Sequence, residues 1–137
     1  MNVLVLTSEP ISAEQLRDAL GSAGDPADAA DTEVMVVAPA LAESAMKFWM
    51  SDADDAIARA EQVRRESVER LGEAGVPATG ETGEADPYTA IEDALKTFEA
   101  DRIVLFTHRG EGQRYREDLD DREIAERFGV PVDHATV

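Results

Sequence analysis

The segment from residue 107 to residue 121 concentrates several kinds of side chain that could bind a ligand or perform chemistry. Glycines in such a segment let the backbone approach phosphate, and arginines pair with anions. Carboxylates bind Mg²⁺ or Ca²⁺, and a histidine acts as a base or metal ligand near neutral pH. The residue types therefore predict an anion site, a metal site or a solvated surface. The residues are Thr107, His108, Arg109, Gly110, Gly112, Arg114, Arg116, Glu117, Asp118, Asp120 and Asp121.

The spacing of these residues favours the surface interpretation over catalysis. The acidic cluster lacks the glycine and the terminal glutamate of a calcium loop, so a solvated helix start is favoured. The arginines are expected to pair with neighbouring carboxylates or to cover a dimer surface. His108 alone is a weak signal for catalysis, and His134 is expected to be structural. The chain shows no Ser-His-Asp order, zinc spacing or complete phosphate loop, and it has no cysteine.

Strands and helices that alternate along the chain must position these side chains. Apolar runs predict strands, helical periodicity and capping residues predict helices, and the alternation predicts a doubly wound five-stranded parallel α/β sheet with helices on both faces. Ligands of such sheets bind beyond the carboxyl ends of the strands, here after Leu6, Ala38 and Phe106. The predicted strands are residues 2–6, 33–38, 78–83 and 102–106, with a weaker one in 130–132 and 135–137; the helices are residues 12–21, 52–71, 87–98 and 121–128.

The second half of the chain resembles the universal stress protein family, a group of small doubly wound domains of which many bind ATP and most dimerise. Residues 83–91 read Gly-Glu-Ala-Asp-Pro-Tyr-Thr-Ala-Ile, and residues 100–110 read Ala-Asp-Arg-Ile-Val-Leu-Phe-Thr-His-Arg-Gly. They are similar to the family's Gly-Asp-Pro-x-x-x-Ile helix start, its Ala-Asp-hydrophobic strand and its Gly-Ser-Arg-Gly loop. The first half agrees through topology alone. The resemblance implies one Rossmann-like, adenine nucleotide alpha hydrolase-like domain over residues 1–137.

The family's nucleotide signature is degenerate in this chain. ATP-binding members carry Gly-x-x-Gly, nine residues, and then Gly-Ser or Gly-Thr; here Thr107 replaces the first glycine, Gly110 is retained, and Asp120 and Asp121 replace the last pair. A carboxylate beside a triphosphate costs about 1 kcal/mol per charge pair at 4 Å in water. Asp120 and Glu123 also have capping-box spacing, so the helix start is expected to be satisfied internally. If a site is retained, the resemblance implies Thr7, Ser8, Val37, Thr107, His108, Arg109, Gly110, Gly112, Asp120 and Asp121 as its residues.

Composition restricts the partners. The 137 residues carry 30 acidic and 13 basic side chains, a formal net charge of -17, which repels nucleic-acid phosphates and anionic membranes. We therefore expect neither nucleic acid nor membrane as a partner. The apolar N-terminal run lacks a basic flank and makes a poor signal peptide, so a cytoplasmic protein is expected. The resemblance implies a homodimer through the C-terminal strand, together with unknown protein partners.

The resulting hypothesis is a universal-stress-protein-like regulatory or binding protein that does not bind ATP in the usual way, has no chemistry of its own and needs no cofactor. One alternative is a switch that binds ATP or AMP with Mg²⁺ through a rearranged loop at residues 107–112. A second is an enzyme that uses His108 or the acidic cluster with a metal. A third is a partner-binding module that exposes an apolar surface around Phe48 and Trp49, next to Met46 and Met50.

Overall fold

The computed structural model describes residues 2–20, 33–39, 53–83, 87–107 and 121–136. Strands and helices alternate through these ranges, as the sequence predicts. The elements are β1 (Asn2–Thr7), α1 (Ala13–Leu20), β2 (Glu33–Pro39), α3 (Ala53–Glu73), β3 (Ala78–Gly83), α4 (Pro87–Leu95), β4 (Arg102–Thr107), α5 (Asp121–Phe128) and β5 (Val132–Thr136).

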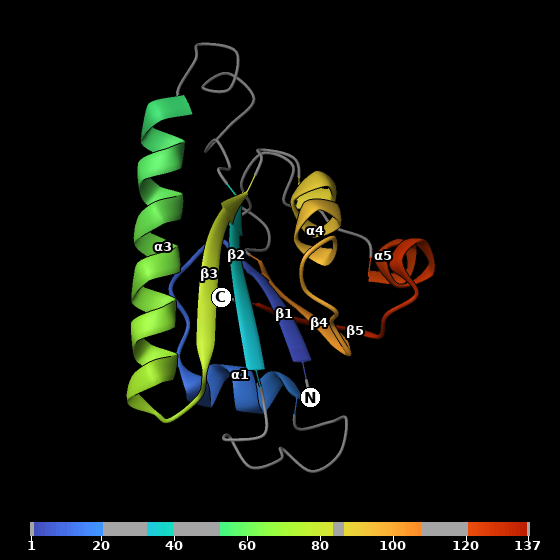
Figure 1. Ribbon diagram of the computed structural model, residues 1–137, viewed down its shortest axis with the longest axis horizontal. Coiled ribbons are helices and arrows are strands. Elements are labelled where there is room, and N and C mark those ends of the chain that lie inside the picture. Colours follow the sequence, from blue (N-terminus) through green and yellow to red (C-terminus); the bar gives the residue numbers. More distant parts are fainter. Residues whose placement is uncertain (1, 21–32, 40–52, 84–86, 108–120, 137) are drawn as a thin grey trace.

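The strands form a five-stranded parallel sheet in the order β3-β2-β1-β4-β5. β1 lies at the centre, and β3 and β5 are the outermost strands (Figure 1). The predicted five-stranded parallel sheet is confirmed. Because β2 follows β1 on one side while β4 pairs with β1 on the other, the sheet has a switch in strand order at β1, where ligands of open α/β sheets bind.

The core has two apolar layers, one on each face of the sheet. Alternate side chains of a strand point to opposite faces, so Val3 and Val5 pack with α1 and α3, whereas Leu4 and Leu6 pack with α4 and α5. All of these strand side chains are buried. Burial on both faces explains why the central strands read as continuous apolar runs rather than as alternating ones.

Local signals define the ends of α1 and α3. Ser12 caps α1 in a reciprocal capping box: the Gln15 amide donates to the Ser12 hydroxyl at 3.2 Å, and the Ser12 amide donates to the Gln15 side chain at 2.8 Å. α3 ends in a Schellman motif, in which the Val76 amide donates to the Leu71 carbonyl at 2.9 Å. Gly75 supplies the required left-handed conformation with φ of 82°. Gly72 lies inside α3.

Several predicted boundaries differ from the structure by one residue, and three elements differ by more. The long helix continues to Glu73, two residues beyond its predicted end, because the Schellman turn forms at Gly75. The helix that begins at Pro87 ends at Leu95, and residues 96–97 form a turn. The last strand is continuous from Val132 to Thr136 rather than two pieces, since it pairs with β4 along its length. In the described part of the chain, no helix is long and apolar enough to cross a membrane.

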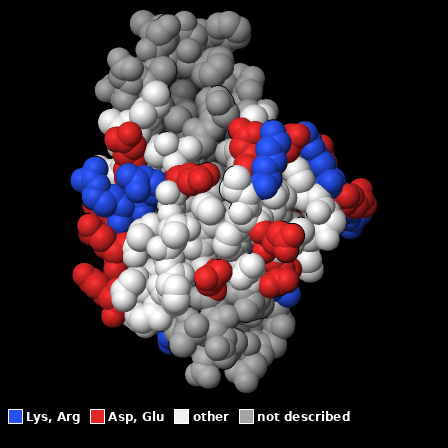
Figure 2. Space-filling model, in the orientation of Figure 1, with Lys and Arg blue, Asp and Glu red and all other residues white. Residues whose placement is uncertain are grey.

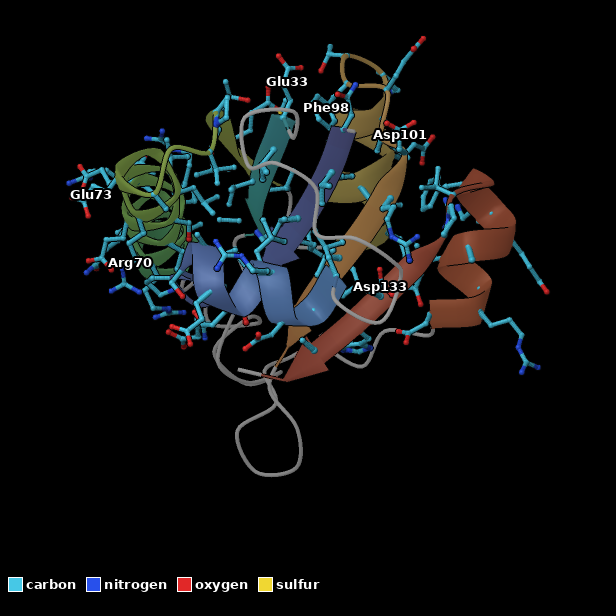
Figure 3. All side chains as sticks on the ribbon, turned by 90° about the horizontal axis from the view of Figure 1, so that it is seen from below. Glu33, Arg70, Glu73, Phe98, Asp101 and Asp133 are labelled. Carbon is cyan, nitrogen blue, oxygen red and sulfur yellow. The ribbon has the colours of Figure 1, made fainter. Side chains whose placement is uncertain are left out.

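The amino ends of the strands carry hydrogen bonds that fix the register of β1 and β4. The Asn2 amide donates to the Asp101 carboxylate at 2.8 Å, and the Asp101 amide donates to the Asn2 carbonyl at 2.7 Å. Figure 3 views the molecule from this end and shows Glu33 and Asp101 there, with Phe98 close by. On the neighbouring strand pair, Arg102 binds Asp133 at 2.7 Å. These contacts hold the end of the sheet opposite the candidate site.

Candidate functional site at the carboxyl end of β1

The carboxyl end of β1 lies between the carboxyl ends of its two neighbouring strands, β2 and β4. Leu6 is in register with Val37 on β2 and with Leu105 on β4, and Thr7 is in register with Phe106. The sequence-predicted residues Thr7, Ser8, Val37 and Thr107 therefore meet at one edge of the sheet. The structure brings their backbones together, and the side chains of Thr7, Ser8 and Val37 differ in what they can offer a ligand.

Thr7 does not present a free hydroxyl. Its side chain is fully buried, and Oγ1 donates to the Glu9 carbonyl at 2.6 Å while accepting from the Glu9 amide at 3.2 Å. These two bonds close a tight turn directly after β1. Ser8 is also buried and has polar contacts of its own. The end of β1 is thus occupied by contacts within the protein.

Val37 contributes to the core. Its side chain is 2% exposed and packs in the apolar layer beneath α4 and α5, so only its backbone reaches the strand end. Thr107 is the last residue of β4 and is in register with Thr136. The other predicted ligand-binding residues lie outside the described residues, as does the predicted apolar patch: His108, Arg109, Gly110, Gly112, Arg114, Arg116, Glu117, Asp118, Asp120, Met46, Phe48, Trp49 and Met50.

Asp121, the first residue of α5, is held by a histidine from β5. The Asp121 Oδ1 and His134 Nδ1 atoms are 2.6 Å apart, and the histidine side chain is 14% exposed. His134 is in register with Leu105, so this pair lies two residues before the carboxyl end of β4. The pair ties the start of α5 to the outer strand of the sheet. The expected structural role of His134 therefore has a specific contact that the sequence pattern did not indicate.

A buried serine from α3 secures the loop that follows β1. The Ser67 side chain is fully buried, and its hydroxyl accepts a hydrogen bond from the Ile11 amide at 3.1 Å. The two residues joined by this hydrogen bond lie 56 residues apart in the sequence. Ser67 thus fixes the loop whose first residues form the candidate site.

Replacing Ser67 with Ala is expected to lower the free energy of unfolding by about 1–3 kcal/mol, because the Ile11 amide would stay buried without an acceptor. Denaturant unfolding measures this change, and hydrogen exchange at the Ile11 amide should accelerate. The matched control is Thr97→Ala, since the Thr97 side chain is exposed. An unchanged Ile11 exchange rate in the Ser67 variant would contradict the anchoring role.

The described residues contain no group of three or more acidic, histidine or cysteine side chains that could hold a metal ion. The described part of the site contains main-chain hydrogen-bonding groups and the Asp121–His134 pair. Such groups can bind and position a ligand.

Comparisons with known proteins agree with this architecture. No protein-family model matches the chain, and no curated protein matches it. Solved structures with the same fold include a universal stress protein family protein from Arabidopsis thaliana with AMP bound, at 14% identity and a TM-score of 0.60 over 99% of this chain and 91% of the other. A universal stress protein in complex with cAMP aligns at 20% identity and a TM-score of 0.57, covering 98% of this chain and 96% of that one.

A third solved structure is the hypothetical protein MJ0577, whose biochemical function was assigned from its structure. It is 12% identical, has a TM-score of 0.64 and covers 99% of this chain and 95% of its own. The alignments extend over both halves of the chain, including the first half, where the sequence agreed with the family through topology alone. In the residues that the structure describes, this chain has the fold of solved universal stress protein structures.

Proposed function

We propose that this chain is a member of the universal stress protein family that acts by binding and regulation and does not hold ATP in the family's usual way. The turn at the end of β1 carries the proposal. A free polar side chain there would recognise a nucleoside, whereas both hydrogen-bonding functions of the Thr7 hydroxyl are used by Glu9. The β1 end has little left to offer a ligand.

Asp121 adds electrostatic support. It replaces a neutral residue of the family's signature, and its carboxylate lies at the start of α5, near the end of β4. A helix start would otherwise attract an anion. A carboxylate at that position satisfies the helix from within and repels a phosphate. The departures at Thr107 and Asp120 act in the same direction, because both remove glycines of the signature.

A nucleotide-binding switch is the second candidate function. It is supported by the AMP and the cAMP in two structures that share the fold over almost the whole chain. Gly110 is retained from the signature, and Gly112 and Arg109 provide further groups that suit a phosphate. In this alternative, the loop at residues 107–112 is rearranged and Mg²⁺ relieves repulsion from the carboxylates.

Thermal unfolding with ATP, ADP, AMP or cAMP, each with and without Mg²⁺, separates the two functions. A ligand present at 100 times its dissociation constant stabilises a protein by about 2.7 kcal/mol. We expect no rise in the melting temperature at millimolar nucleotide, because the carboxylates and the closed turn oppose binding. A clear rise with any of these nucleotides would overturn the proposal in favour of the switch.

Restoring the family's signature residues tests whether their replacement is what prevents nucleotide binding. The triple variant Thr107→Gly, Asp120→Gly and Asp121→Ser should gain a nucleotide-dependent rise in melting temperature. Because it also removes two negative charges, the matched control is Glu61→Gln with Glu69→Gln, two exposed positions on α3. A response in the control as large as in the triple variant would contradict the assignment to these three positions, as would no response in either.

On the basis of the family resemblance, we also propose a homodimer that forms through β5. In the described sheet this strand has a neighbour on one side, β4, and an unpaired strand edge favours association. Light scattering of the purified protein is expected to report twice the monomer mass. A monomer at high protein concentration would remove this part of the proposal.

A further inference from the structure

The opposite edge of the sheet, at β3, has main-chain groups available for pairing. The Val34 amide donates to the Pro77 carbonyl at 3.0 Å, and Val34 is in register with Ala78. In a parallel pair, this arrangement turns the amide and carbonyl groups of Ala78, Gly80 and Thr82 away from β2. No strand in the described part of the chain pairs with them. An open edge of this kind can accept an extended segment as an additional strand.

One side of α3 forms a shelf beside this edge. Ile57, Glu61, Arg64 and Val68 are four, three and four residues apart, so they lie on the same side of the helix, where Glu61 is exposed between Ile57 and Arg64. A Cβ atom built on Gly80 would lie 2.5 Å from Arg64 Cγ and 2.9 Å from Val68 Cγ2, which shows how closely this side of α3 lies against β3. Figure 1 shows α3 running alongside β3. Ile57 is 45% exposed, the one large hydrophobic residue exposed in the described ranges.

Arg64 lies on the shelf and Arg65 flanks it, about 100° further around the helix; in the described ranges neither has a counterion. Arg64 is half-buried and Arg65 is exposed, and within the described chain neither guanidinium makes an ion pair or a hydrogen bond. Other arginines are paired, such as Arg70 with Glu66 and Arg127 with Glu92. Figure 2 shows basic side chains gathered over the middle of α3. Unpaired cations beside an open edge are unexpected in a protein with a net charge of -17.

We propose that the β3 edge and this shelf bind an extended segment of a partner protein, which adds to the sheet as a strand parallel or antiparallel to β3. Side chains of an added strand alternate between the two faces. Those that face α3 are acidic toward Arg64 and Arg65 and apolar toward Ile57 and Val68. Main-chain hydrogen bonds supply the affinity, and the shelf supplies the specificity.

The other face of β3 restricts the remaining side chains of the partner. Thr79 is in register with Met35, and its hydroxyl lies 4.0 Å from the Met35 sulfur, so this face is the one covered by α4 and α5. Glu81 has the same parity as Thr79 and is exposed. A partner residue near Glu81 is therefore neutral or basic. The partner strand thus has acidic and apolar residues on the face toward α3 and no acidic residues on the other face.

Charge favours an acidic peptide at the β3 edge over a second copy of this chain or a nucleic acid. A second copy related by a two-fold axis would bring identical surfaces together, so Arg64 and Arg65 would face their own counterparts. Nucleic acid would be attracted by the two arginines but repelled by the net charge of -17, and it would leave the edge of β3 unpaired. An acidic peptide is repelled by the net charge as well, but it gains the edge hydrogen bonds.

A capped peptide, Thr-Val-Thr-Glu-Thr-Glu-Thr-Val-Thr, is the probe. Its palindromic sequence presents the same faces in both strand directions. Titrated into the labelled full chain, it should shift the amide resonances of Ala78, Gly80 and Thr82 and bind more tightly than a peptide with Lys in place of both Glu residues. This order of affinities is the reverse of what a protein of net charge -17 would produce nonspecifically.

Variants and modified peptides distinguish strand addition from other binding. Arg64→Gln with Arg65→Gln should weaken binding about tenfold, since two charge-assisted contacts are lost, and Ile57→Ala should weaken it further. Arg17→Gln with Arg122→Gln removes the same charge from exposed helix positions away from the shelf and should leave binding unchanged. N-methylation of alternate peptide amides should weaken binding unequally in the two parities, because an antiparallel strand uses the amides of the residues that face α3 and a parallel strand uses those of the residues between them.

Three results would overturn the proposal. The first is absence of binding, and the second is equal loss of binding in both N-methylated peptides. The third is a single-stranded oligonucleotide that binds the shelf more tightly than the acidic peptide does. Since the β3 edge lies across the sheet from β5 and does not include the end of β1, nucleotide titrations report on the proposed function independently of these outcomes.

Discussion

Replacement of Leu71 by Ala is expected to lower the free energy of unfolding by about 2–5 kcal/mol, the range found for large-to-small changes in protein cores. The Leu71 side chain is fully buried in the apolar layer that contains Val34, Val36 and Val76. It also lies at the Schellman motif where α3 turns toward β3, so the cavity would form where the helix joins the sheet. The change is a large fraction of the about 5–15 kcal/mol by which domains are usually stable.

Denaturant titration with two spectroscopic probes measures this effect. The matched control is Ile57→Ala on the same helix, because that side chain is 45% exposed and its removal costs little burial. Ile57→Ala also replaces a β-branched residue with a better helix former, so the control is expected to keep or gain stability. Equal stability of the two variants would contradict the assigned position of α3 on the sheet.

Replacement of Gly80 by Ala is expected to cost about 1–3 kcal/mol, the usual range for overpacking. The new Cβ would lie 2.5 Å from Arg64 Cγ and 2.9 Å from Val68 Cγ2. Neither neighbour moves easily, since Arg64 Cγ is close to the helix backbone and Val68 is β-branched. The melting temperature should fall, and the peptide proposed for the β3 edge should bind more weakly because α3 is displaced.

Gly72→Ala is the matched control for that experiment. A Cβ at Gly72 meets nothing within 4 Å, and glycine inside a helix costs about 0.8–1.0 kcal/mol relative to alanine. The control is therefore expected to raise stability while Gly80→Ala lowers it. A second test is the double variant Gly80→Ala with Arg64→Ala, which removes the closest contact and should recover part of the loss. No recovery would indicate a cause other than the contact with Arg64.

The two open edges of the sheet lead to different expectations for assembly. β5 has the proposed homodimer as its partner, and β3 has the proposed extended segment of another protein. Because the two strands lie on opposite sides of β1, both partners could be bound at once. A protein of this kind would connect a dimer to a client without any chemical step, which agrees with the proposed regulatory role.

The architecture followed from local patterns in the sequence. Residues 2–6, 33–38 and 102–106 are apolar without alternation, which predicted strands buried on both faces, and all three are confirmed. Residues 78–83 were the marginal case, because Ala-Thr-Gly-Glu-Thr-Gly contains few apolar side chains. They form a strand because β2 pairs with them along their length and α3 packs closely on Gly80.

The candidate site was predictable in position but not in detail. Its position followed from the predicted parallel sheet, since the carboxyl ends of parallel strands meet at one edge of the sheet. The hydrogen bonds of the site could not be predicted from the sequence. Nothing in the types of Thr7 and Glu9 indicated that the threonine hydroxyl would be used twice by one neighbouring residue.

The sequence by itself determined the order of strands and helices, the burial of the central strands, the capping of α1 by Ser12 and the large negative charge. These properties depend on residues that are neighbours along the chain or on simple sums. Only the tertiary structure decided that His134 holds Asp121, 13 residues away, and that Ser67 holds the Ile11 amide, 56 residues away. It also decided that Arg64 lies against Gly80. Such contacts depend on strand register and on where each helix packs, and neither is encoded in any short stretch of residues.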